Sequence, residues 1–165
     1  MMKKIWFVAV MAAICVGCAT SEATRQARAE RQVKEAEAVK KGIETKDFKI
    51  NVNYVYPVGA SPMQLSTPYY LKVKGDSVMS YLPYFGRAYS VPYGGGKALN
   101  FDGRILRYAA EQVKSDRMVV RMDIVNDETE YVYTIDIFDN GSSTIDVVSH
   151  SRETIRFSGN MEMPD

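Results

Sequence analysis

The stretch Tyr131–Val148, YVYTIDIFDNGSSTIDVV, decides the fold of this 165-residue chain. Apolar and polar side chains alternate along it with a period of two, which is typical of β-strands with one buried face. Asn140 and Gly141 interrupt the alternation. An Asn-Gly pair is a strong hairpin signal, because both residues readily take the positive φ values of a two-residue turn. The stretch therefore predicts two antiparallel strands joined at this pair.

The same period of two recurs on both sides of this stretch and predicts further strands. The residues expected to share a buried face are Phe48, Ile50, Val52, Tyr54 and Tyr56; Tyr69, Leu71 and Val73; and Met118, Val120, Met122 and Ile124. A hairpin is expected at Gly75–Asp76, and a last strand at Thr154–Ser158. The segment Asn100–Val113 fits a helix in its later part or a bent strand equally well.

Eight or so short antiparallel strands predict a mainly β domain over residues 46–165. An up-and-down meander that forms a lipocalin-like barrel or half-barrel is favoured over a Greek-key sandwich, because closure removes unprotected sheet edges. Residues 18–45 are expected to form a tether and one charged N-terminal α-helix. From about Ser21 to Lys41 the chain is rich in good helix formers, and Gly42 suits the position just past a helix end. Few large apolar residues lie in this segment, which favours a solvated spacer over a partner-binding helix.

Residues 1–17 have the pattern of a secretory signal peptide: a basic start at Lys3–Lys4, an apolar run at Ile5–Val16 and then Gly17. The apolar run is shorter than the roughly 20 residues of a membrane-spanning helix. Cys15-Val-Gly-Cys18 resembles the bacterial lipoprotein box, although leucine is usual where Cys15 stands. This resemblance implies cleavage before Cys18, lipidation of Cys18 and attachment to a membrane.

Composition excludes several classes of function. Both cysteines, Cys15 and Cys18, lie in the N-terminal segment, so the mature domain has no disulfide and no cysteine ligand for a metal. With one histidine as well, no metal site and no cofactor are expected. Loss of residues 1–17 removes Lys3 and Lys4 and leaves 19 basic against 20 acidic residues. A net charge near −1 argues against nucleic acid as a partner.

Motifs for catalysis are weak. Gly94–Lys97 lacks the spacing of a phosphate-binding loop, and Ala98 stands where that loop needs Ser or Thr. A hydrolase acting on a cell-envelope polymer would need either a carboxylate pair, or a serine paired with His150, within catalytic reach in a cleft. No sequence motif supports such a pair, so catalytic residues are not assigned and the chain is expected not to be an enzyme. The hydrolase remains the alternative hypothesis.

An aromatic, glycine-rich stretch lies between the expected strands, at Tyr81–Gly96. Its large amphipathic side chains could line a barrel mouth or stack on a sugar or an apolar ligand. The candidate ligand-binding residues are Tyr81, Tyr84, Phe85, Arg87, Tyr89 and Tyr93. The alternative is that these residues fill the core where the sheet bends, and that alternative is favoured. Pro83 and Pro92 should lie at strand ends or edges, because proline cannot donate a ladder hydrogen bond.

Three stretches together resemble a family of lipoprotein-like proteins from Bacteroides-type bacteria, domain of unknown function 4251. They are Tyr69–Asp102, FDNGSS at Phe138–Ser143 and RETIRFSG at Arg152–Gly159. The family tends to have glycine where this chain has Ala98. The resemblance implies an anchored β domain of lipocalin-type topology and no known activity. The sequence thus predicts an envelope lipoprotein, at the outer membrane and facing the periplasm, that binds a small apolar or carbohydrate ligand or docks an envelope protein.

Overall fold

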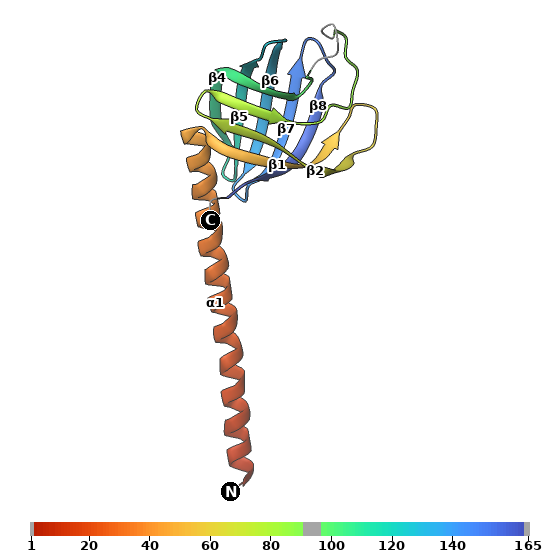
Figure 1. Ribbon diagram of the computed structural model, residues 1–165. Helices are drawn as coiled ribbons and strands as arrows, with labels where there is room; N and C mark the ends of the chain where they lie inside the picture. Colours follow the sequence, from red (N-terminus) through yellow and green to blue (C-terminus); the bar gives the residue numbers. More distant parts are fainter. Residues whose placement is uncertain (1, 91–96, 164–165) are drawn as a thin grey trace. The chain divides into compact units, whose positions relative to one another are not determined.

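The computed structural model describes residues 2–90 and 97–163, with side chains from residue 22 onward. One helix precedes eight strands, which form a closed barrel in which each strand pairs with its neighbours in sequence and β8 pairs with β1 (Figure 1). The elements are α1 (Met2–Thr45), β1 (Asp47–Tyr56), β2 (Met63–Lys74), β3 (Ser77–Tyr81), β4 (Asn100–Lys114), β5 (Arg117–Val125), β6 (Glu130–Phe138), β7 (Ser142–Ser149) and β8 (Ile155–Met161). The predicted up-and-down barrel with one N-terminal helix is confirmed.

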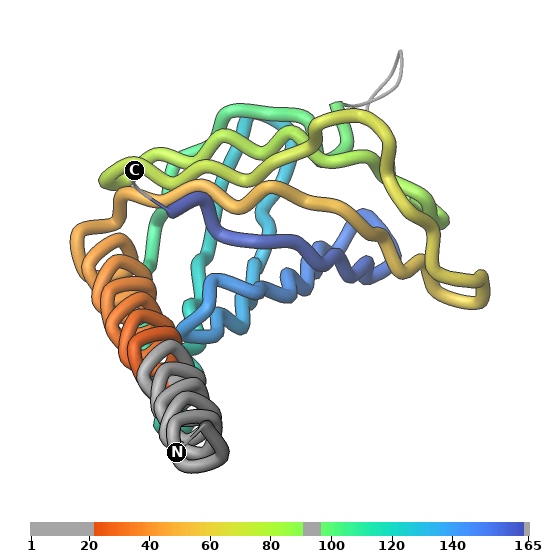
Figure 2. Tube along the Cα trace, turned by 90° about the horizontal axis from the view of Figure 1, so that it is seen from below, coloured from red at the N-terminus to blue at the C-terminus, as the bar shows by residue number. Residues whose placement is uncertain are grey.

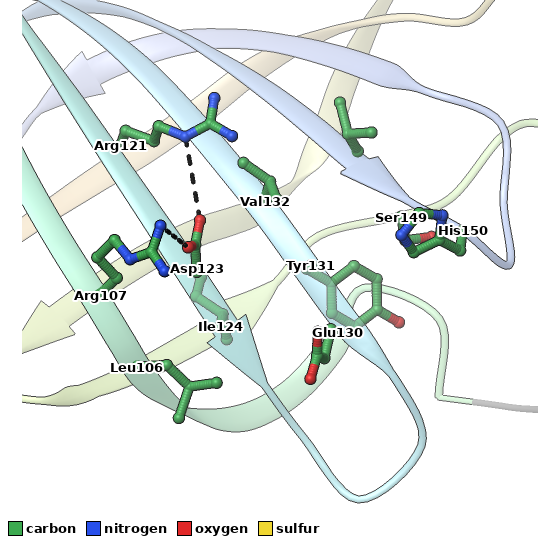
Figure 3. A pocket seen from close by; sticks show the side chains of 11 residues that line it. Leu106, Arg107, Arg121, Asp123, Ile124, Glu130, Tyr131, Val132, Ser149 and His150 are labelled. Atoms are coloured by element: carbon green, nitrogen blue, oxygen red, sulfur yellow. Dashed lines mark ion pairs between the residues drawn. The ribbon is translucent and has the colours of Figure 1, made fainter.

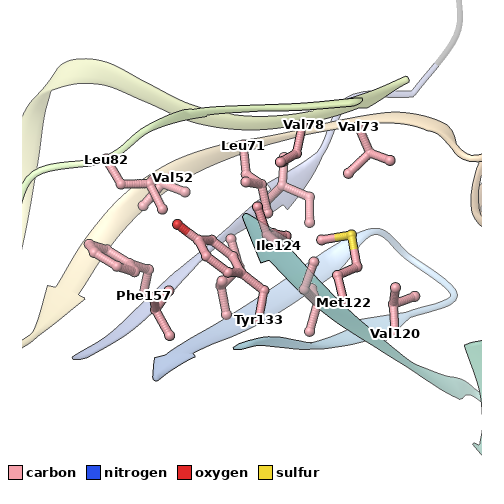
Figure 4. Close-up of a cluster of buried hydrophobic side chains, with 14 of the residues drawn as sticks. Val52, Leu71, Val73, Val78, Leu82, Val120, Met122, Ile124, Tyr133 and Phe157 are labelled. Atoms are coloured by element: carbon pink, nitrogen blue, oxygen red, sulfur yellow. The ribbon is translucent and has the colours of Figure 1, made fainter. Parts of the chain in front are cut away.

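Large apolar side chains fill the barrel. The strands run around a central space (Figure 2), and the side chains that point into it meet one another (Figure 4). The fully buried members with the greatest volume include Tyr131, Tyr133, Phe157, Leu71, Met122, Ile124 and Ile135. Alternation along β6 is strict, because every second residue from Tyr131 to Ile137 is buried. Burial of this kind stabilises the fold by about 1.5–3 kcal/mol for each large apolar side chain.

Strand β1 departs from the predicted alternation. Its inward residues are regular up to Val52, but the register then shifts, Val55 is fully buried and Tyr54 is exposed. The prediction that Tyr54 and Tyr56 face the core is therefore wrong. A β-bulge adds one residue to the strand and reverses the faces beyond it. Gly159 on β8 pairs with Val52 at this point.

The turn after β6 has three residues rather than two. Gly141 donates its N–H to Phe138 O at 2.8 Å and takes a φ of 80°, whereas Asn140 does not have a positive φ. This is the combination of an ordinary turn with a left-handed glycine that three-residue hairpins favour. The hairpin was predicted correctly, but its predicted two-residue turn is wrong.

Strand β4 resolves the ambiguous segment. It is a strand of 15 residues whose register shifts between Ile105 and Arg107, so Leu106 is an extra residue and is 52% exposed. The bent strand, rather than the helix, is therefore correct.

Helix α1 runs through Gly42 and ends at Thr45, so the prediction that Gly42 follows the helix end is wrong. Val39 and Ile43 belong to the same buried cluster as the barrel interior. A Cβ on Gly42 would lie 2.5 Å from Met161 Cε and 3.2 Å from Asp47 O, so glycine serves here for close packing. The compact unit that contains the barrel accordingly spans Glu35–Asp165.

The end of α1 is fixed to the barrel by polar contacts as well. Tyr108 donates its hydroxyl to Ile43 O at 2.8 Å, and burial raises the pKa of Tyr108 to about 12. Lys46 follows the helix with a φ of 53°, which helical backbone does not have. Its carbonyl oxygen accepts the N–H of Gly75 at 2.8 Å, and its ammonium group forms an ion pair with Asp76 at 2.9 Å. These contacts close one end of the barrel, which we call the helix end. Among the described residues, no helix is long and apolar enough to cross a membrane.

Candidate functional site

The opposite end of the barrel, where β3 ends and β4 begins, is also closed; we call it the loop end. Leu82 and Leu99 are 3% and 1% exposed, and Leu82 donates its N–H to Leu99 O at 3.2 Å. Inside the barrel, the Ser80 hydroxyl donates to the same carbonyl at 2.7 Å and lies 3.0 Å from the Tyr133 hydroxyl. Because Ser80 has one hydroxyl proton, Tyr133 is the donor of that second bond.

Residues 82–90, which we call the aromatic loop, are attached to the turn between β7 and β8. Ala88 and Arg152 form an isolated antiparallel bridge. Tyr89 donates its N–H to Ser151 O at 2.8 Å, and Glu153 donates its N–H to Arg87 O at 2.9 Å. Paired backbone groups of this kind fix the path of a loop that has no regular structure of its own. Pro83, which was expected at a strand end or edge, follows the end of β3 at Tyr81 and lies outside the strands.

Side chains support the same attachment. The Tyr84 hydroxyl lies 2.7 Å from Arg87 O and 3.1 Å from Glu153 O, and burial raises the pKa of Tyr84. The guanidinium carbon of Arg152 lies 5.2 Å from the centre of the Tyr84 ring, within the range of a cation–π contact. Arg152 is only 9% exposed and also interacts with Tyr131. The loop is thus held by backbone and side-chain contacts together.

The described members of the predicted ligand-binding set lie in different surroundings. Tyr84 holds the aromatic loop, whereas Phe85 and Tyr89 project from it and are 43% and 68% exposed. Tyr81 lies apart at the end of β3, with its ring 5.3 Å from that of Tyr69 and 5.6 Å from that of Tyr70. Of the remaining two, Arg87 is exposed on the loop, and Tyr93 falls outside the described residues, as do Pro92 and Gly94–Gly96.

Sequence reasoning missed Arg152 and Glu153. The backbone N–H of Arg87 donates to Glu153 Oε2 at 3.3 Å, so Glu153 holds the loop through both its side chain and its main chain. Nothing in the alternation of polar and apolar residues indicates this role. The one available signal is that both residues begin the RETIRFSG stretch on which the family resemblance rests.

A hollow of about 400 Å³ lies on the outer wall of the barrel near β5 and β6. Asp123 lies between Arg107 and Arg121, with N–O distances of 3.4 and 4.0 Å, while His150 borders the other side (Figure 3). Among the described side chains, no hydrogen bond joins His150 to a serine or a carboxylate, and Ser149 Oγ lies 3.3 Å from Ser151 Oγ instead. In this hollow His150 is therefore not paired with a serine, whereas two carboxylates, those of Asp123 and Glu130, both line it. Within the described ranges, no group of three or more His, Cys, Asp or Glu side chains could hold a metal ion.

Ala98 occupies an unusual backbone position next to the loop end. Its φ is 53°, in the left-handed region. This conformation is less favourable by about 1–2 kcal/mol for a residue with a Cβ than for glycine. The turn is closed by the Asn100 N–H, which donates to Lys97 O at 3.0 Å. A glycine, which the family resemblance leads us to expect here, would adopt this conformation without strain.

The fold and its closed ends define a small, filled, up-and-down β-barrel with an attached helix. The family model described as Domain of unknown function (DUF4251) matches residues 30–161, and the chain belongs to this family. A similar solved structure is that of a DUF4251 family protein from Bacteroides eggerthii DSM 20697, with 12% sequence identity and a TM-score of 0.60. The match covers 78% of this chain and 87% of the other, and it concerns the fold alone. A comparison with curated proteins gave no match.

Proposed function

We propose that this chain is a non-enzymatic docking domain of the bacterial cell envelope. It is anchored through lipidated Cys18 to the outer membrane, faces the periplasm and binds an envelope protein through the aromatic loop. The observation that carries the docking role is the exposure of Phe85 and Tyr89 on a loop that is fixed to the turn at residues 151–153. Rigid, exposed aromatic side chains provide contact area at low entropic cost, which is why they recur at binding hot spots.

Filling of the barrel favours docking over binding of a small ligand inside it. Tyr133 and Phe157 are fully buried in the interior, Leu82 lies at the loop end, and Ile43 lies at the helix end. A pocket for a drug-sized ligand typically encloses roughly 300–1,000 Å³. Three hollows lined by described residues lie along the outer wall and beside the helix end, and are open to solvent. An outer surface is therefore the better place for recognition.

A photo-crosslinking amino acid at position 89 tests the docking role in living cells. We expect illumination to yield one discrete adduct with an envelope protein, because Tyr89 projects from the loop. The same amino acid at position 111, where exposed Glu111 lies on β4, is the matched control and should give no such adduct. Identical adduct patterns at the two positions, or no adduct at 89, would contradict the docking proposal.

Anchoring rests on the N-terminal sequence. A basic start, a short apolar run and Gly17-Cys18 together fit a lipoprotein signal. Two acyl chains are sufficient for stable attachment to a bilayer, whereas one is marginal. Cys18 is the first residue that the proposed cleavage would leave, and it would otherwise be an unpaired thiol in an oxidising compartment.

Metabolic labelling with a fatty-acid probe tests the anchor. The wild-type chain should carry the label and sediment with membranes, and Cys18→Ser should lose both properties completely. Cys15→Ser is the matched control and should keep both, because Cys15 lies in the segment that is removed. Label retained by Cys18→Ser would show that the anchor has been assigned to the wrong residue.

A further inference from the structure

The outer wall of β2, β3 and β4 carries two cations on either side of a hydroxyl. Lys74 pairs with Ser77 across β2 and β3, and Ser77 pairs with Arg104 across β3 and β4. Residues that pair directly on antiparallel strands have Cβ atoms roughly 4.5–5.5 Å apart and point to the same face. The three side chains, all exposed, therefore form one continuous row.

A hollow of about 490 Å³ lies over this row. A second row of paired residues runs beside the first. In it Lys72 on β2 pairs with Met79 on β3, and Met79 pairs with Asp102 on β4. The hollow thus brings together three cations, one carboxylate, one hydroxyl and a methionine that is 42% exposed.

Most of the other cations on the outer wall form ion pairs with carboxylates. Lys49 binds Glu162 at 2.8 Å, Arg117 binds Asp136 at 3.1 Å, and Arg156 binds Asp146 at 2.6 Å. In the part of the chain that the structure describes, no carboxylate lies within ion-pair distance of Lys72, Lys74 or Arg104, although Glu162 acts on Lys72 from farther away. Three cations that border one hollow repel one another, and an anion between them would relieve that repulsion.

We propose that this hollow binds a phosphate-type anionic group between Lys74 and Arg104, with the Ser77 hydroxyl as a further donor. The guanidinium group offers a planar pair of donors that matches phosphate oxygens, and the ammonium group adds a compact charge. Three cations against Asp102 leave an excess of two positive charges. A phosphate monoester carries about −1.5 to −2 at neutral pH, whereas a carboxylate carries about −1. Exposed Met79 provides an apolar contact for the group that bears the phosphate. This site is separate from the aromatic loop and does not depend on docking there.

Backbone NMR signals of the full chain, isolated from cell envelopes in a neutral detergent, test the site. Inorganic phosphate is added at constant ionic strength, with chloride as the reference anion. The amide signals of Ser77, Met79 and Gly103 should shift saturably with phosphate and not with chloride. In the double variant Lys74→Gln, Arg104→Gln the affinity should fall at least tenfold. Lys114→Gln is the matched control, because Lys114 is an exposed strand cation outside the hollow, and it should bind as the wild type does.

A second titration separates a free phosphate from a lipid headgroup. Phosphatidic acid, a lipid whose headgroup is a phosphate monoester, is added to the same detergent micelles instead of inorganic phosphate. Shifts with phosphatidic acid alone, lost in the double variant, would support the site and identify the source as a headgroup. Shifts with inorganic phosphate would support it with a soluble ligand. The proposal is overturned if neither compound shifts these signals, or if the double variant binds as tightly as the wild type.

Discussion

Replacement of Ile43 by alanine is expected to lower the free energy of unfolding of the barrel by about 2–5 kcal/mol. Ile43 lies on α1, yet its side chain is completely buried in the same cluster as the barrel interior. Shortening the side chain removes buried apolar surface and leaves a cavity that the surrounding strands cannot fully close. A loss of this size would show that the last turns of the helix are part of the folded barrel unit.

Val33→Ala is the control for this prediction, because Val33 lies on the same helix and is 58% exposed. It should change the stability by no more than about 0.5 kcal/mol. Urea unfolding followed by circular dichroism measures both variants. Equal stability of the Ile43 and Val33 variants would contradict the assignment of the last turns of α1 to the barrel core.

Replacement of Gly159 by alanine is expected to destabilise the barrel by about 3 kcal/mol through overpacking. The added Cβ would lie 2.8 Å from both Asn51 C and Val52 Cα and would also meet Asn51 O. These are backbone atoms of the neighbouring strand, so no side-chain rotation can relieve the contact. The two strands would have to separate at the β-bulge that places Val55 inside the barrel.

Asn160→Ala provides the matched control on the same strand. Asn160 is exposed and pairs with Asn51, so its truncation should alter the stability by no more than about 0.5 kcal/mol. Thermal unfolding of both variants gives the comparison. If Gly159→Ala were as stable as Asn160→Ala, the close approach of β8 to the bulge would be refuted.

Much of the fold could be predicted because its signals are local. Strict alternation along β6 and the glycine after Asn140 identify a hairpin without knowledge of distant contacts. The faces of Tyr54 and Tyr56 could not be predicted in this way. They depend on a bulge in β1 opposite Gly159, a residue more than a hundred positions away in the sequence. The role of Gly42 could not be predicted for the same reason. Glycine is needed there because Met161 packs closely against it, and not because the helix ends.

The candidate site was only partly predictable. The aromatic composition of the loop is evident in the sequence, but which of its rings are exposed depends on hydrogen bonds to residues 151–153. Tyr84 and Tyr89 look alike in sequence, yet one holds the loop while the other is 68% exposed. The unpaired cations beside Ser77 are likewise invisible until the register of β2, β3 and β4 is known. Contacts between segments that are distant in sequence decide which side chains are exposed and which lie together, and composition does not show these contacts.

The most direct test of the central claim, that the barrel is filled and recognises its partner from outside, is NMR of the full chain under xenon pressure. Xenon enters dry apolar cavities, and its gas pressure fixes its activity even when a membrane or detergent is present. We expect the methyl signals of Ile124, Ile135 and Ile145 to stay unchanged in the wild type. Tyr133→Ala, which opens a cavity among them, should show saturable shifts and serves as the positive control. Saturable shifts of these signals in the wild type would contradict the account and return the binding site to the barrel interior.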